Sequence, residues 1–156
     1  MTQRTCILAL ATAVGLSAAC HVLGPGRGAL EDLRDSRRRW ENSALTDYSF
    51  VLQRACFCGM EAMGPVRITV EDGVRTSAIY VESGEPVGSM YEQHFPTMAG
   101  LFDQLEEMFA RADVIEAEYH PTLGYPVEVQ IDFITNAIDD ELGLSIRDVQ
   151  AAGTPG

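Results

Sequence analysis

Residues 98–133, MAGLFDQLEEMFARADVIEAEYHPTLGYPVEVQIDF, combine a helical and a strand pattern in one continuous stretch. In 98–112 the apolar residues recur every three or four positions, which predicts an amphipathic helix with Thr97 as its N-cap. Apolar and polar residues then alternate through 114–120 and 126–133, as in strands with one buried face. A helix followed by a hairpin indicates an α+β domain with an antiparallel sheet.

The polar sides of these two strands are strongly acidic. We expect their apolar sides to face the core, and because an antiparallel sheet can leave its second face in water, we expect the acidic sides to be exposed. This acidic face is a candidate surface for a partner or a cation. Its residues are Glu116, Glu118 and His120 on the first strand, and Glu128, Gln130 and Asp132 on the second.

The same order of elements occurs earlier in the chain. Residues 29–44 show helical spacing, 47–58 form an apolar segment predicted to be a strand, and an Asp-Gly dipeptide (72–73) separates two alternating segments, 65–71 and 74–82. Asp-Gly in this position is a strong hairpin signal, because both central residues of a type I′ turn need positive φ. One face of the hairpin, expected in the core, carries Val66, Ile68, Val70, Ile79 and Val81.

The two halves together predict one domain over residues 29–150. Residues 83–96 lack periodicity and are expected to form a loop, 142–150 form the last predicted strand, and 151–156 a disordered tail. A helix followed by three strands therefore occurs twice, which indicates a weak internal duplication. We predict an α+β fold, with an antiparallel sheet of about six strands and two helices on one face.

Residues 1–19 have the features of a lipoprotein signal peptide. Arg4 supplies the positive charge, and the uncharged apolar run after it is too short to cross a membrane. Small residues precede Cys20, which makes Cys20 the predicted lipid attachment site, followed by a flexible Gly- and Pro-containing tether over 20–28. The match is relaxed, because Ser17 stands where Leu is usual, and ordinary secretion is the alternative.

An acylated Cys20 would hold the mature protein in the cell envelope, in contact with the membrane through its lipid. His21, rather than Asp, follows the cysteine. This favours the outer membrane, facing the periplasm or the surface, in a cell that has two membranes.

The charge of the chain is −12 and is unevenly distributed. Residues 42–156 contain five Arg and 19 acidic residues, a net charge of −14. Such a domain repels nucleic-acid phosphates, so nucleic-acid binding is not expected, whereas a basic envelope protein would be attracted. The alternative is that the charge only keeps an exported domain soluble.

Several short motifs occur in a fixed order along the chain. They are Trp40 with Asp47–Phe50, Cys56-Phe57-Cys58, residues 65–73, Phe95-Pro96-Thr97 with Leu101-Phe102, Gly124-Tyr125-Pro126, Ile131-Asp132 and Ile138–Glu141. Together they resemble a family of bacterial lipoproteins of unknown function, catalogued as domain-of-unknown-function family 6174. The resemblance runs from about residue 30 to 149 and implies an exported lipoprotein, but it implies no activity.

Cys56 and Cys58 are the strongest chemical feature of the sequence. Two residues apart on a strand, they point to the same side, with Cα atoms about 6.6 Å apart, near the upper limit for a disulfide. A bend at Gly59 could close the gap, and an oxidising envelope favours the bond. A structural disulfide is the main prediction; a redox-active pair, a metal pair completed by His21, His94 or His120, and two free thiols are the alternatives.

A second cluster of carboxylates precedes the last predicted strand. Asp139, Asp140 and Glu141, with Asp132 seven residues before the first of them, could bind a hard cation such as Ca²⁺, although no EF-hand spacing is present. The alternative is an Asp that caps a turn. No catalytic motif is present, so we assign no catalytic residue, no metal ligand and no cofactor.

These features lead to one main hypothesis and two alternatives. The main one is a non-catalytic, lipid-anchored envelope domain that presents its acidic sheet face, or the 83–96 loop, to a partner. The first alternative is a thiol–disulfide protein that uses Cys56 and Cys58. The second, an inhibitor- or immunity-type binder, rests on analogy of fold only.

Overall fold

A computed structural model describes residues 25–152, with the side chains of 25–27 excepted. The predicted signal peptide, Cys20 and the tail 153–156 lie outside the described residues. The elements, in chain order, are α1 (Pro25–Asn42), β1 (Tyr48–Cys56), the 3₁₀ turn η1 (Met60–Ala62), β2 (Val66–Glu71), β3 (Val74–Tyr80), the 3₁₀ turn η2 (Glu92–His94), α2 (Met98–Phe109), β4 (Val114–Tyr119), β5 (Pro126–Asp132) and β6 (Glu141–Ala151).

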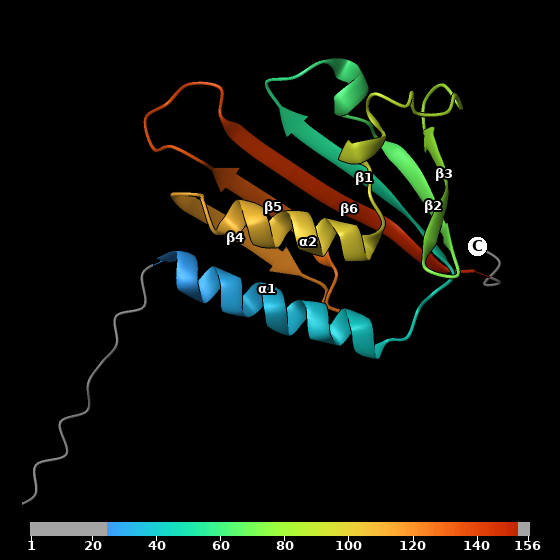
Figure 1. The fold of residues 1–156 in the computed structure, drawn as a ribbon, viewed down its shortest axis with the longest axis horizontal. Coiled ribbons are helices and arrows are strands. Elements are labelled where there is room, and N and C mark those ends of the chain that lie inside the picture. The colour runs from blue at the N-terminus through green and yellow to red at the C-terminus, as the bar shows by residue number, and fades with distance from the viewer. Residues whose placement is uncertain (1–24, 153–156) are drawn as a thin grey trace, which may run out of the picture.

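The six strands form one sheet in the order β3-β2-β1-β6-β5-β4, and every neighbouring pair is antiparallel. Both helices lie on the same face of this sheet (Figure 1). Each helix is followed by three strands that occupy consecutive places, and the two sets run across the sheet in the same sense, joined where β1 pairs with β6. The predicted α+β architecture with two helix–three-strand units is therefore confirmed.

The core lies between the helices and the covered face of the sheet. α2 buries five residues in it, from Met98 to Phe109, and α1 contributes Leu33 and Trp40. The strands contribute alternate residues, such as Phe50 and Leu52 in β1 and Ile68 in β2, because successive side chains point to opposite faces. The helical and alternating patterns in the sequence thus correspond to one shared core.

The start of α2 is fixed by two caps from different parts of the chain. The Thr97 hydroxyl accepts a hydrogen bond from the Gly100 backbone N–H (3.2 Å), as expected for an N-cap. The Tyr48 hydroxyl of β1 accepts another from the Met98 N–H (3.1 Å). Because Tyr48 is buried, this second bond ties the helix to the sheet and satisfies a donor that the helix itself leaves unpaired.

The β2–β3 hairpin confirms the predicted turn but corrects the predicted face of β3. Asp72 and Gly73 both take positive φ, 50° and 75°. A bulge between Thr69 and Val70 then shifts the register of β3, so that its core side carries Ala78 and Tyr80. The prediction that Ile79 and Val81 share the core face is wrong: they are 38% and 44% exposed.

α1 begins at Pro25, so the last residues assigned to the tether, 25–28, form its first turn. Its other half packs on the β4–β5 turn, where Gly124 has φ +79°. A Cβ there would lie 2.2 Å from the Ser36 carbonyl oxygen, so only glycine permits this approach. Within the described part of the chain, neither helix combines the length and the apolar character that a membrane span needs.

Candidate functional site

Because both helices lie on one face of the sheet, the opposite face is open in the described part of the chain (Figure 1), and its β4–β5–β6 side is the acidic face predicted from the sequence. Across β4 and β5, Glu118 lies directly opposite Glu128, and Glu116 lies opposite Gln130. Across β5 and β6, Asp132 lies opposite Glu141. Like charges directly opposite one another destabilise a sheet. The structure therefore places two repulsive cross-strand pairs on one open surface.

None of these acidic residues forms an ion pair within residues 25–152. The single side-chain hydrogen bond among them runs from the Gln130 amide, which donates to the Glu128 carboxylate (3.1 Å). Charged residues of the helices, in contrast, do form ion pairs; for example, Arg34 of α1 donates to Glu106 of α2 at 2.6 Å. The acidic face thus presents carboxylates that the described part of the protein does not neutralise.

A shallow depression of about 220 Å³ interrupts this face at Gly143 of β6. A Cβ at Gly143 would come within 3.0 Å of the Gln130 side chain, so the glycine leaves room for that side chain to lie across the strand. Beyond it the open face changes character, since Val51 is flanked by Arg67 of β2 and Arg147 of β6. The acidic character is therefore confined to one side of the open face.

The second predicted cluster lies in and beside the β5–β6 loop. Asp139 is exposed and has φ 72°, as in a turn, and both carboxylate oxygens of Asp140 are buried without a hydrogen-bond partner. No three His, Cys, Asp or Glu side chains in residues 25–152 are grouped so as to hold a metal ion. The cation site proposed for Asp132, Asp139, Asp140 and Glu141 is thus not assembled in this structure.

Cys56 and Cys58 form the predicted disulfide, with Cα atoms 5.3 Å apart. The bend that brings the two cysteines together lies at Phe57 and not at Gly59, where the sequence suggested it. The Cys58 N–H donates to the Cys56 carbonyl (2.9 Å), which turns the chain at Phe57 and shortens the distance between the two cysteines. The same turn pushes the Phe57 side chain outward, where it is 81% exposed.

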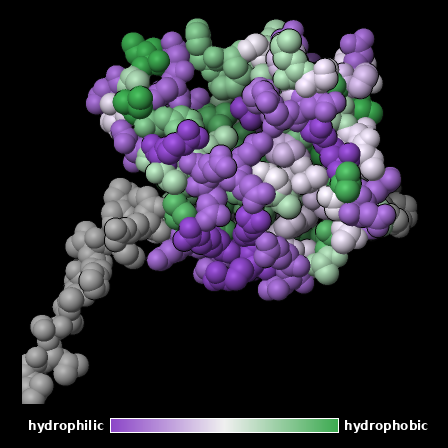
Figure 2. Space-filling view, in the orientation of Figure 1, coloured by the Kyte–Doolittle hydropathy of each residue, from purple (hydrophilic) through white to green (hydrophobic). Residues whose placement is uncertain are grey.

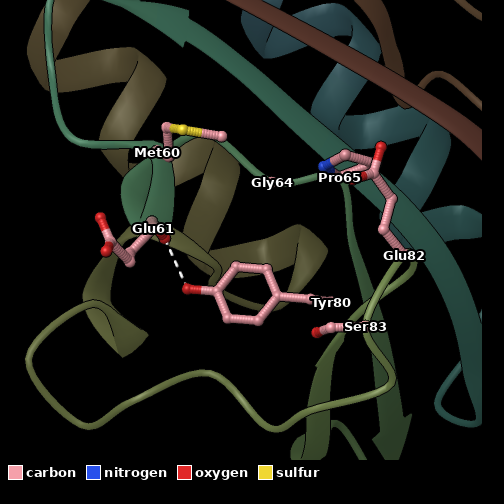
Figure 3. A pocket seen from close by; sticks show the side chains of 7 residues that line it. All are labelled: Met60, Glu61, Gly64, Pro65, Tyr80, Glu82 and Ser83. Atoms are coloured by element: carbon pink, nitrogen blue, oxygen red, sulfur yellow. Dashed lines mark hydrogen bonds between the residues drawn. The ribbon is translucent and has the colours of Figure 1, made fainter.

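A cavity of about 320 Å³ lies just after this disulfide, under the β1–β2 connection (Figure 3). Its walls are largely apolar, formed by Met60, Pro65 and the ring of Tyr80, and its size is at the lower end for small-ligand sites. The Tyr80 hydroxyl donates to the Glu61 carbonyl oxygen (2.6 Å), and burial raises the pKa of Tyr80. No local pattern of residues predicts this cavity, because its walls come from separate segments.

Two histidines considered as metal ligands have other contacts. His120 stacks on Tyr125 with ring centroids 4.8 Å apart, and its Nδ1 accepts hydrogen bonds from the Thr122 and Leu123 N–H groups, so it holds the β4–β5 turn. Burial, and then the charge of nearby Arg54, lower the pKa of His94. His21 lies outside the described residues.

Arg54 is a feature that the sequence did not single out. It alternates with Leu52 and Cys56 on the core-facing side of β1, and burial lowers the pKa of its guanidinium. Its Nε has no hydrogen-bond partner, and no acidic residue in the described part of the chain pairs with it. A half-buried cation is therefore held on the same side of the strand as Cys56.

The model of DUF6174, a family of unknown function, matches residues 32–151. The chain belongs to this family. The family predicted from the motifs is therefore confirmed, and the DUF6174 region includes all six strands, the disulfide and the cavity. Comparisons with curated proteins and with solved structures gave no significant match.

Proposed function

We propose that this DUF6174 protein is a non-catalytic envelope protein, anchored by a lipid on Cys20, whose acidic sheet face binds a basic partner protein. The observation that carries the proposal is the cross-strand pairing of Glu118 with Glu128 and of Asp132 with Glu141. Each pair costs stability in the isolated domain. A positively charged partner would remove that cost on binding, because it would lie between carboxylates that now repel one another.

The shallowness of the depression at Gly143 also favours a protein partner over a small molecule. The acidic face spans β4, β5 and the start of β6, and the depression at Gly143 in it is shallow. Small-molecule sites are usually concave and mostly apolar, whereas protein interfaces can be flat and can use charge to guide association. A basic surface of a neighbouring envelope protein has the matching chemistry.

Photo-crosslinking in intact cell envelopes tests the proposal. A photoreactive residue replaces Gln130, in the middle of the acidic face, and in a matched control it replaces Glu107, which is exposed on α2. We expect a discrete adduct with a basic protein from position 130 and none from position 107. Adducts of the same size and yield from both positions, or none from either, would contradict the proposal.

The lipid anchor has its own test. Mass spectrometry of the mature N-terminus should show a peptide that begins at Cys20 and carries acyl chains. An unmodified peptide that begins elsewhere would reject the anchor without affecting the claim about the acidic face.

The position of Arg54 favours a second candidate function, thiol–disulfide exchange. Cys58 is exposed, so a partner's thiolate could attack its sulfur, and Cys56 would leave as a thiolate near the Arg54 cation. We expect the Arg54→Gln substitution to lower the reduction potential of the pair if this function holds. A potential below about −300 mV in the unaltered protein would indicate a structural bond instead.

A further inference from the structure

One end of the domain carries the start of α1 together with several exposed apolar side chains. The register places the end of β1 beside the start of β6, and the end of β5 beside the start of β4. The ion pairs Arg34–Glu106 and Arg37–Asp103 show that α1 runs antiparallel to α2, so α1 starts where α2 ends and β4 follows. Figure 1 shows α1 beginning at the end of the molecule from which the β5–β6 loop projects.

Four large apolar side chains are exposed at this end. Phe57 is 81% exposed, and Ile134 and Ile138 of the β5–β6 loop are 60% and 85% exposed. Val114, at the start of β4, is 44% exposed. Figure 2 shows hydrophobic residues at the upper left edge of the molecule, where Figure 1 draws the β5–β6 loop. Single exposed apolar residues are common, but a group of them at one end of a domain marks an interaction surface.

The loop is held beside β4 by specific contacts. The Thr135 N–H donates to the Asp113 carboxylate (2.9 Å), and the Asp113 N–H donates to the Asp132 carbonyl oxygen (3.0 Å). The isoleucines therefore belong to a loop that is bonded to the start of β4. They can contact one surface together with Val114.

The length of chain before α1 indicates what that surface is. Cys20 and Pro25 are five residues apart in the sequence, and an extended chain of that length reaches about 18 Å at most. A lipid on Cys20 would thus keep the start of α1 close to the bilayer. We infer that Phe57, Val114, Ile134 and Ile138 insert into the lipid interface and orient the domain, an inference that rests on the proposed acylation of Cys20.

The charges around this end indicate which headgroups suit it. Asp139 and Glu141, which follow Ile138 closely in the sequence, are both exposed. Phosphatidylethanolamine and phosphatidylcholine present cationic nitrogen groups that complement these carboxylates, whereas anionic lipids repel them. The partner is therefore a zwitterionic lipid surface, with the acidic sheet face beside it and accessible.

Tryptophan quenching in vesicles tests this orientation. The full-length protein, expressed with its signal peptide and confirmed as acylated by mass spectrometry, is reconstituted in vesicles of phosphatidylethanolamine and brominated phosphatidylcholine. The variants are Ile138→Trp and, as a matched control, Val74→Trp, which is 64% exposed at the β2–β3 turn on the opposite end of the sheet. Both replace exposed residues, and Trp40 gives the same buried background in each.

We expect the added tryptophan of Ile138→Trp to lose most of its fluorescence and that of Val74→Trp to lose little. Replacing part of the phosphatidylethanolamine with phosphatidylglycerol, with the brominated phosphatidylcholine kept constant, should reduce the quenching of Ile138→Trp. Equal quenching of the two variants, or none in either, in acylated protein would overturn the orientation and leave the anchor and the acidic face intact. A Cys20 without acyl chains would instead reject the anchor, and this inference with it.

Discussion

The two faces of the sheet use the same residue types in opposite ways. On the helix side, apolar residues of the strands are buried, and charged residues of the two helices form ion pairs such as Arg37–Asp103 (2.7 Å). On the open side, Glu118 opposes Glu128 and Asp132 opposes Glu141. One face is arranged for stability, and the other keeps repulsive contacts that folding does not require. Such conflicts with local stability are expected at functional surfaces.

The largest change in stability should come from a substitution in the core between the helices and the sheet. Phe102 of α2 is fully buried, so Phe102→Ala should lower the free energy of unfolding by about 3–5 kcal/mol, because it removes buried surface and leaves a cavity. Glu107→Ala, an exposed change on the same helix, should stay within about 0.5 kcal/mol. Urea denaturation of both variants measures the difference, and similar values for the two would contradict the assigned core.

The ion pairs of the helix face should have a smaller effect. Arg37 donates to Glu41 at 2.9 Å and to Asp103 at 2.7 Å, and these bonds raise the pKa of its guanidinium. Arg37→Gln should lower the free energy of unfolding by about 0.5–1 kcal/mol, and the loss should shrink at high salt. Arg38→Gln, whose single partner Asp35 lies on the same helix, is the control and should lose less. A loss that does not depend on salt would count against the ion pairs.

A substitution on the open face should stabilise the domain instead of destabilising it. Glu118→Gln removes the repulsion from Glu128 and should raise the free energy of unfolding by about 0.2–1 kcal/mol. Glu116→Gln on the same strand lies opposite Gln130, not an acid, and should change it less. Chemical denaturation at low and high salt separates the two. Destabilisation by Glu118→Gln at low salt would show that the pair is not repulsive.

A still smaller change in stability is expected when the pH changes the ionisation of Asp47 beside the β2–β3 turn. The Asp72 N–H donates to the Asp47 carboxylate (3.0 Å), and this bond, followed by that of Thr46, lowers the pKa of Asp47. A lowered pKa means that the folded state favours the ionised carboxylate. The stabilisation is therefore complete above the ordinary Asp pKa and is lost as the pH falls through the lowered value.

Asp47→Asn should accordingly lower the melting temperature at pH 6 slightly. The difference from the unaltered protein should disappear under strongly acidic conditions. Thermal unfolding followed across this pH range measures it, and a difference that is constant with pH would exclude the carboxylate as the cause.

The sequence predicted the local features of the fold well, because these depend on neighbouring residues. The helical spacing of α2, the Thr97 cap and the positive φ of Asp72 and Gly73 follow from short-range preferences. The bulge that turns Ile79 outward does not, because one extra residue in a strand reverses every later side chain without changing the pattern of residue types.

The sequence also predicted only those parts of the candidate site that depend on neighbouring residues. The acidic residues of the open face were identified from alternation alone. Their repulsive pairing depends on register and, for Asp132 and Glu141, on two strands joined by a loop of eight residues. The cavity beside Tyr80 combines separate segments and gave no local signal. Pairing across the sheet is therefore the information that the structure adds.

The most direct test of the account measures stability and binding on the same variant, Glu116→Gln/Glu118→Gln/Glu128→Gln, with the crosslinker at position 130. We predict that the free energy of unfolding stays equal or rises, while the adduct with the basic partner is lost. This outcome would show that the acidic face is kept for binding at a cost in stability. An unchanged adduct in this variant would contradict the central claim, and so would an adduct lost only because the domain unfolds.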